Sequence, residues 1–154
     1  MTSSSPLSPE PTRRLAIVTC MDCRIDLHAA LGLELGQAHV LRNAGGTVTD
    51  DVIRSLAISQ RKLGTREVLV IHHTGCGMQG INEDGFRAEL QADAGVAPPW
   101  SLEGFDDLEE DVRQSVRRVR QSPFLPHRGQ VRGYILDVNT QGLREVDLSE
   151  DADE

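Results

Sequence analysis

The chain has 154 residues, of which 38% are hydrophobic and 3% aromatic, and its formal net charge is −8 at pH 7. This length fits a single domain whose core consists mainly of aliphatic side chains. The acidic balance argues against nucleic acid as a partner, because phosphate binding needs clustered Lys and Arg, and no apolar run approaches the roughly 20 residues of a membrane-spanning helix.

The two ends of the chain differ in composition from its middle. Residues 1–12 are rich in serine and proline and hold no apolar stretch, so we expect a disordered lead-in rather than a secretory signal. Residues 149–154 form an acidic tail, which we expect to be solvated. The folded domain is therefore predicted over residues 13–148. Three cysteines without an export signal favour a reducing compartment, which predicts a cytoplasmic location.

Strand-like and helix-like patterns alternate through this domain. The first run, LAIVT, is apolar throughout, as expected of a strand that is buried on both faces. Other segments have apolar residues at helical spacing, with acidic residues or Thr near their starts. In chain order we predict a strand over 15–19, a helix over 25–33, a strand over 38–41, a helix over 47–63, a strand over 67–72, helices over 82–92 and 105–119, and a strand over 130–138.

The alternation predicts the fold class. Strands that alternate with helices form right-handed βαβ units around a mostly parallel sheet. We therefore predict a three-layer α/β fold with helices flanking a central sheet of order 2-1-3-4. Residues 143–146 follow a turn and are compatible with an antiparallel edge strand. In this order the first and third strands are neighbours, and ligands gather at the carboxyl ends of strands where the chain reverses its winding.

Candidate metal ligands follow both of these neighbouring strands. Cys20 ends the first strand, and His73 and Cys76 follow the third. The predicted topology brings them within metal-binding distance of one another although they are far apart in the sequence. Two thiolates and one imidazole are a typical zinc-binding set with one coordination position left open, which is a feature of catalytic zinc.

Other interpretations of these residues stay open at this point. Cys20 and Cys23 form a Cys-x-x-Cys pair, which also fits a redox protein. Cys20 also fits a buried apolar residue, Asp22 a helix cap, and His73 a histidine bonded to a backbone carbonyl. Asp22 or Cys23 as a permanent fourth ligand would instead make a zinc ion structural or sensory.

Three segments together resemble the signature segments of the β-class carbonic anhydrases, and the short N-terminus is similar to their compact prokaryotic branch. The segments are CMDCR at 20–24, RNAGG at 42–46 and HTGCG at 73–77, within a resemblance that runs from about residue 15 to residue 130. It implies that Cys20, His73 and Cys76 bind one Zn²⁺ per chain, and that Asp22 and Arg24 form the catalytic dyad.

The resemblance also implies an activity, the reversible hydration of carbon dioxide to bicarbonate and a proton by attack of zinc-bound hydroxide. Asp22 would orient the hydroxide and Arg24 would keep Asp22 ionised, while in a closed state Asp22 would itself bind the zinc. A homodimer or higher homo-oligomer is implied as well. Hydrolysis of carbonyl sulfide or carbon disulfide at the same site is the nearest alternative, and a non-catalytic structural or sensing zinc module is another.

Some features depart from the family pattern or lack a role in it. Cys23 stands where the family commonly has Ser or Ala, which introduces a possible competing thiol. Residues 78–101 do not show the aromatic and Gln residues that line the substrate cleft of plant-type relatives. His72 is predicted to point to the face opposite His73. The remaining histidines are candidates for proton transfer that also fit ordinary surface positions: His28, His39 and His127.

Overall fold

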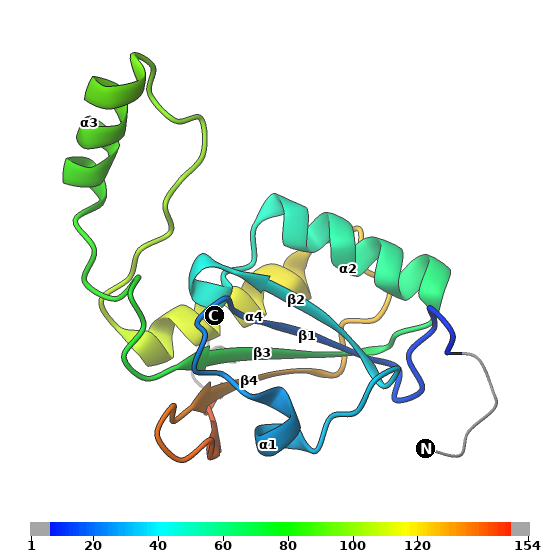
Figure 1. The fold of residues 1–154 in the computed structure, drawn as a ribbon. Helices are drawn as coiled ribbons and strands as arrows, with labels where there is room; N and C mark the ends of the chain where they lie inside the picture. The colour runs from blue at the N-terminus through cyan, green and yellow to red at the C-terminus, as the bar shows by residue number, and fades with distance from the viewer. Residues whose placement is uncertain (1–6, 149–154) are drawn as a thin grey trace.

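The computed structural model describes residues 7–148, in which a five-stranded sheet has helices on both faces (Figure 1). The strands stand in the order β2-β1-β3-β4-β5. Their pairing is parallel except between β4 and β5, which is antiparallel. The predicted order and the antiparallel edge strand are confirmed. The strands are β1 (Leu15–Cys20), β2 (Ala38–Asn43), β3 (Glu67–His73), β4 (Val131–Leu136) and β5 (Leu143–Glu145).

Every predicted helix is present. The helices are α1 (Leu27–Leu31), α2 (Asp50–Leu63), α3 (Glu83–Ala94) and α4 (Leu108–Gln121), and η1 (Ala44–Gly46) is a single 3-10 turn. All four begin one to three residues later than predicted, because a polar side chain caps each start. Asp26 accepts the N–H of Ala29 before α1, and Asp107 accepts the N–H of Glu110 before α4. Thr49 and Asn82 cap α2 and α3 in the same way. Gly32, in the left-handed conformation, ends α1.

Apolar side chains fill two cores, one on each face of the sheet. On one face Val18 packs with Leu56 of α2 and Val116 of α4. On the other face Ile17 packs with Leu27 of the short helix α1. All six residues of β1 are buried, because successive side chains alternate between the two cores. The sheet is thus the middle of three layers, as predicted.

Helix α3 lies apart from these layers, at the end of two long connections (Figure 1). None of its residues is buried. Phe86 within it is 38% exposed, and Trp100 in the returning connection is 57% exposed. We call α3 and its connections, residues 79–104, the arm. The arm therefore adds little to either core.

The predicted lead-in differs from the structure in its last residues. Pro11 is buried, and the N–H of Thr12 donates to the carbonyl oxygen of Gly36 at 2.9 Å. The end of the lead-in is thus ordered beside the start of β2, because its backbone finds partners there that its composition does not reveal.

Residues 1–6 and the predicted acidic tail over 149–154 lie outside the described part of the chain. Within 7–148, no helix is both long enough and apolar enough to cross a bilayer. The longest two, α2 and α4, have 14 residues each, well short of the roughly 20 that a crossing takes.

Candidate metal centre

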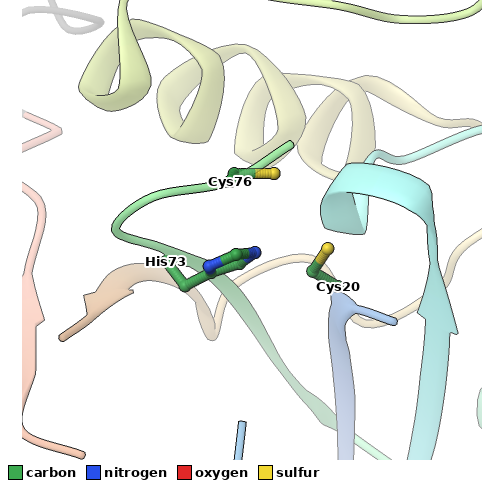
Figure 2. A group of neighbouring side chains, drawn as sticks. All are labelled: Cys20, His73 and Cys76. Carbon is green, nitrogen blue, oxygen red and sulfur yellow. The ribbon is translucent and has the colours of Figure 1, made fainter. Parts of the chain in front are cut away.

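Cys20, His73 and Cys76 meet at the carboxyl ends of β1 and β3. Cys20 is the last residue of β1, His73 is the last of β3, and Cys76 lies in the loop that follows. One ligand atom from each lies within 4.8 Å of the other two. Figure 2 shows the three side chains pointing toward one another. All three are buried. We call these residues the metal group.

The side-chain hydrogen bond of His73 leaves one ring nitrogen free to bind a metal ion. Nδ1 donates to the carbonyl oxygen of Thr74 at 2.8 Å, so in the neutral ring Nε2 carries the lone pair. Nε2 is buried and has no hydrogen-bond partner among residues 7–148. Metal-ligating histidines typically donate one ring N–H to a carbonyl in this way and bind the ion with the other nitrogen. The donor set therefore fits a zinc ion.

Electrostatics at the metal group favour a cation. The neighbouring thiol of Cys76 lowers the pKa of Cys20, against the opposing effect of burial. The same contact, together with burial, raises the pKa of Cys76. Burial lowers the pKa of His73, but the sulfur of Cys20 and the carbonyl of Thr74 outweigh it and the net shift is upward. A divalent ion would replace the protons that these groups share.

Backbone N–H groups point at both sulfurs. Gly45 donates to Sγ of Cys20 at 3.3 Å, and Met78 donates to Sγ of Cys76 at 3.5 Å. The turn that carries Gly45 touches β1 at Gly46, where a Cβ would lie 2.9 Å from the backbone nitrogen of Cys20. Both glycines have positive φ, 88° and 65°. They are needed for backbone geometry, because a side chain would keep the turn away from the sulfur.

Asp22 and Arg24 form a two-pronged ion pair beside the metal group. Nε and Nη2 of Arg24 donate to Oδ1 and Oδ2 of Asp22 at 2.9 and 2.6 Å. The guanidinium holds the pKa of Asp22 well below its usual range. Oδ2 lies 3.7 Å from Nε2 of His73. Arg24 also donates to the carbonyl oxygen of Gly75 at 2.9 Å. The carboxylate is therefore ionised, fixed in orientation and close to the donors.

Two further side chains hold this loop, and neither was assigned from the sequence. Arg42 of β2 donates to the carbonyl oxygens of Cys20 and Asp22 at 2.8 and 2.7 Å. Gln141, just before β5, donates to the carbonyl oxygen of Arg24 at 2.7 Å. Arg42 begins the RNAGG segment, so the resemblance of that segment to a family signature could have indicated it. Gln141 lies in a turn far along the chain, and no local pattern indicates its contact.

The other candidate residues lie outside the metal group. Cys23 is an exposed free thiol. His72 is buried on the opposite face of β3, as predicted, and its Nε2 donates to Oδ2 of Asp111 at 2.7 Å. The histidines considered for proton transfer bond elsewhere: His28 to Leu33, His39 to Ser59 and Pro9, and His127, through its backbone, to Gln60.

A groove of about 1110 Å³ lies beside the loop that follows Cys76, and no member of the metal group lines it. Met78, whose N–H donates to Cys76, lines it together with Phe86 and Trp100 of the arm. Residues 78–101 do not show the aromatic and Gln residues of the plant-type substrate cleft, but they supply two aromatic side chains to this groove. Sequence reasoning missed them because the fold of the arm, rather than a local pattern, places both rings along one surface.

The chain is similar to known proteins over most of its length. The model of the carbonic anhydrase family matches residues 15–100. Beta-carbonic anhydrase 1 of Mycobacterium tuberculosis is 52% identical over 141 residues, which cover 92% of this chain and 86% of that protein. A carbon disulfide hydrolase of Acidithiobacillus thiooxidans is 35% identical over 153 residues, covering 86% of this chain and 76% of that protein.

Solved structures agree with these matches. The crystal structure of carbonic anhydrase from Streptococcus mutans superimposes with a TM-score of 0.86 at 46% sequence identity, covering 94% of this chain and 88% of that one. The matched family residues include all three members of the metal group and both members of the Asp22–Arg24 pair. The chain belongs to the β-carbonic anhydrase family.

Proposed function

We propose that this protein catalyses the reversible hydration of carbon dioxide to bicarbonate and a proton at one zinc ion held by Cys20, His73 and Cys76. The observation that carries the proposal is the convergence of two sulfurs and a bare imidazole nitrogen beside an ionised carboxylate. Three protein ligands leave zinc one position for a water molecule. The 52% identity to a β-carbonic anhydrase supports the choice of substrate.

In this proposal the ion supplies a Lewis acid that makes water nucleophilic at neutral pH. Asp22 accepts a hydrogen bond from the nucleophile and directs its lone pair toward carbon dioxide. Arg24 holds the carboxylate ionised through the two-pronged contact, and Arg42 fixes the backbone that carries Asp22. Gly75 accepts from Arg24 and so ties the pair to the loop of Cys76.

The ion pair between Asp22 and Arg24 distinguishes the open state of the site from the closed state, in which Asp22 would bind the zinc. With both carboxylate oxygens bonded to Arg24, Asp22 stands beside the metal group rather than within it. This arrangement supports an open, catalytic site over a structural or sensing module in which Asp22 closes the coordination sphere. Displacement of Asp22 onto the zinc would require that Arg24 release it.

The experiment that tests the function combines zinc content with stopped-flow carbon dioxide hydration. Replacement of any member of the metal group by Ala should remove both zinc and activity. Cys23→Ala is the matched control, because Cys23 is a thiol three positions from Cys20 that lies outside the metal group. Full hydration activity in a zinc-free Cys20→Ala protein would refute the proposal.

Carbon disulfide hydrolysis is the second candidate, favoured by the relatives of that name at 35% identity and below. Carbon disulfide, carbonyl sulfide and carbon dioxide are all linear molecules that the same nucleophile can attack. Parallel assays of the three substrates with one enzyme preparation separate the candidates. A kcat/KM highest for carbon dioxide is expected.

We also propose that the protein is a homodimer or higher homo-oligomer. An arm whose helix has no buried residue, with Trp100 57% exposed beside the groove, supports a second copy as the covering surface. Sedimentation velocity tests this, and a monomer at high concentration would contradict it. A cytoplasmic location is part of the proposal, supported by the absence of disulfides among the three cysteines, all of them described.

A further inference from the structure

His72 precedes His73 in β3 and points to the opposite face of the sheet, and the proposed reaction does not use it. Its side chain is 1% exposed, and Nε2 donates to Oδ2 of Asp111 in the first turn of α4 at 2.7 Å. The other ring nitrogen, Nδ1, is buried with no hydrogen-bond partner in the part of the chain that the structure describes. Asp111 is thus the polar anchor of this ring, and its loss would leave a buried imidazole unpaired.

The same ring contacts the segment that holds the loop of Cys76. The centroids of the His72 and Phe105 rings lie 5.9 Å apart at an interplanar angle of 41°. Phe105 donates its N–H to the carbonyl oxygen of Met78 at 3.2 Å and accepts from the N–H of Gly80 at 2.7 Å. Met78 in turn donates to the sulfur of Cys76. A chain of contacts therefore leads from α4 to the second thiol.

We propose that His72, Asp111 and Phe105 form a positioning cluster that sets the distance between His73 and Cys76, and hence the metal affinity of the site. The cluster acts on both residues. His72 shares its backbone with His73, so anchoring one ring to α4 orients the strand end that carries the other. Through Phe105, the same anchor holds the loop of Cys76. This inference rests on the proposed metal group.

The test is a titration of the chelated protein with Zn²⁺ against a competing chelator, and with Co²⁺ while the thiolate-to-cobalt charge-transfer absorption is recorded. Asp111→Leu should weaken metal affinity about tenfold and change the cobalt absorption. Loss of a group that hydrogen-bonds a metal ligand costs about 10–100-fold in affinity, and the lower end applies here because Asp111 bonds His72, the neighbour of the ligand. Asp111→Asn, whose amide oxygen still accepts from Nε2, should restore both. Glu110→Leu is the control, because it removes an exposed carboxylate from the same helical turn.

Phe105→Ala gives a second route in case Asp111→Leu does not fold, with the exposed Phe124→Ala as its control. Phe105→Ala should weaken metal affinity and Phe124→Ala should not. Variants that lose thermal stability yet bind both metals like the wild type would show a merely structural cluster and overturn the inference. A wild-type protein without the thiolate-to-cobalt absorption would instead refute the metal group, and the inference with it.

Discussion

Gly46 lies where η1 touches the end of β1, and we expect its replacement by alanine to disable the metal group. Its φ is 65°, and a Cβ there would lie 2.9 Å from the nitrogen of Cys20 and 2.9 Å from the carbonyl carbon of Thr19. Both atoms belong to a strand that is paired on each side, so the turn has to move instead. Its displacement would take the N–H of Gly45 away from the sulfur of Cys20.

Two costs contribute to the size of the effect. A left-handed backbone costs a residue with a Cβ about 1–2 kcal/mol, and overpacking costs about 1–3 kcal/mol. Gly46→Ala should therefore lower the free energy of unfolding by about 2–5 kcal/mol, and the Tm by about 4–20 °C for a chain of this size. Gly32→Ala is the matched control: its φ is also 65°, but a Cβ there meets no atom within 4 Å. Only the first cost then applies.

Thermal unfolding followed by circular dichroism, with zinc content measured on the same samples, separates the two costs. We expect Gly46→Ala to lose most of its zinc and to melt well below Gly32→Ala, which should keep its zinc. Equal Tm values and equal zinc contents for the two variants would show that the close approach at Gly46 does not constrain the site, and the reasoning would be wrong.

Three more outcomes concern the side chains around the metal group. Asp22→Asn should keep zinc and lower kcat/KM for hydration about 100-fold, because an uncharged amide loses the ion pair with Arg24 and accepts a weaker hydrogen bond from the nucleophile, and an unchanged stopped-flow rate would exclude Asp22 from the mechanism. Arg24 depresses the folded-state pKa of Asp22, so the ionised carboxylate stabilises the fold above its unfolded pKa of about 3.9, and this contribution is lost as the pH falls through the folded value. The free energy of unfolding, measured with urea, should therefore fall less steeply between about pH 6 and pH 3 in Arg24→Ala than in the wild type. Parallel curves of this free energy against pH would contradict the prediction. Arg42→Lys keeps the charge but cannot span the carbonyls of Cys20 and Asp22, so hydration should fall several-fold with zinc retained, and wild-type hydration would show that this bridge is dispensable.

The strand order and the meeting of the metal group were predictable for the same reason. An apolar run such as LAIVT is buried on both faces only as an inner strand, and right-handed crossovers then leave few possible orders. Once β1 and β3 are neighbours, Cys20 and His73 must end at the same edge of the sheet. Two local patterns combined with one topological rule were therefore sufficient.

The supporting contacts were not predictable in this way. Gln141 reaches a carbonyl oxygen more than 100 positions away, and Asp111 reaches His72 from another helix. Such bonds join a side chain to whatever group the fold brings near it, so they leave no periodic or local signature in the sequence. The contact of Thr12 with Gly36 went unpredicted for a related reason, because backbone groups bond without regard to residue type.

The two strands that carry Cys20 and His73 are interior strands of the sheet, each hydrogen-bonded on both sides. Their amide hydrogens should exchange with solvent only when the whole domain opens, whereas those of α3, with no buried side chain, should exchange through small local fluctuations. Fast motion of the arm can thus change the access of small molecules to the groove. Cys20 and His73 meanwhile stay fixed, because β1 and β3 belong to the part of the molecule that opens most slowly.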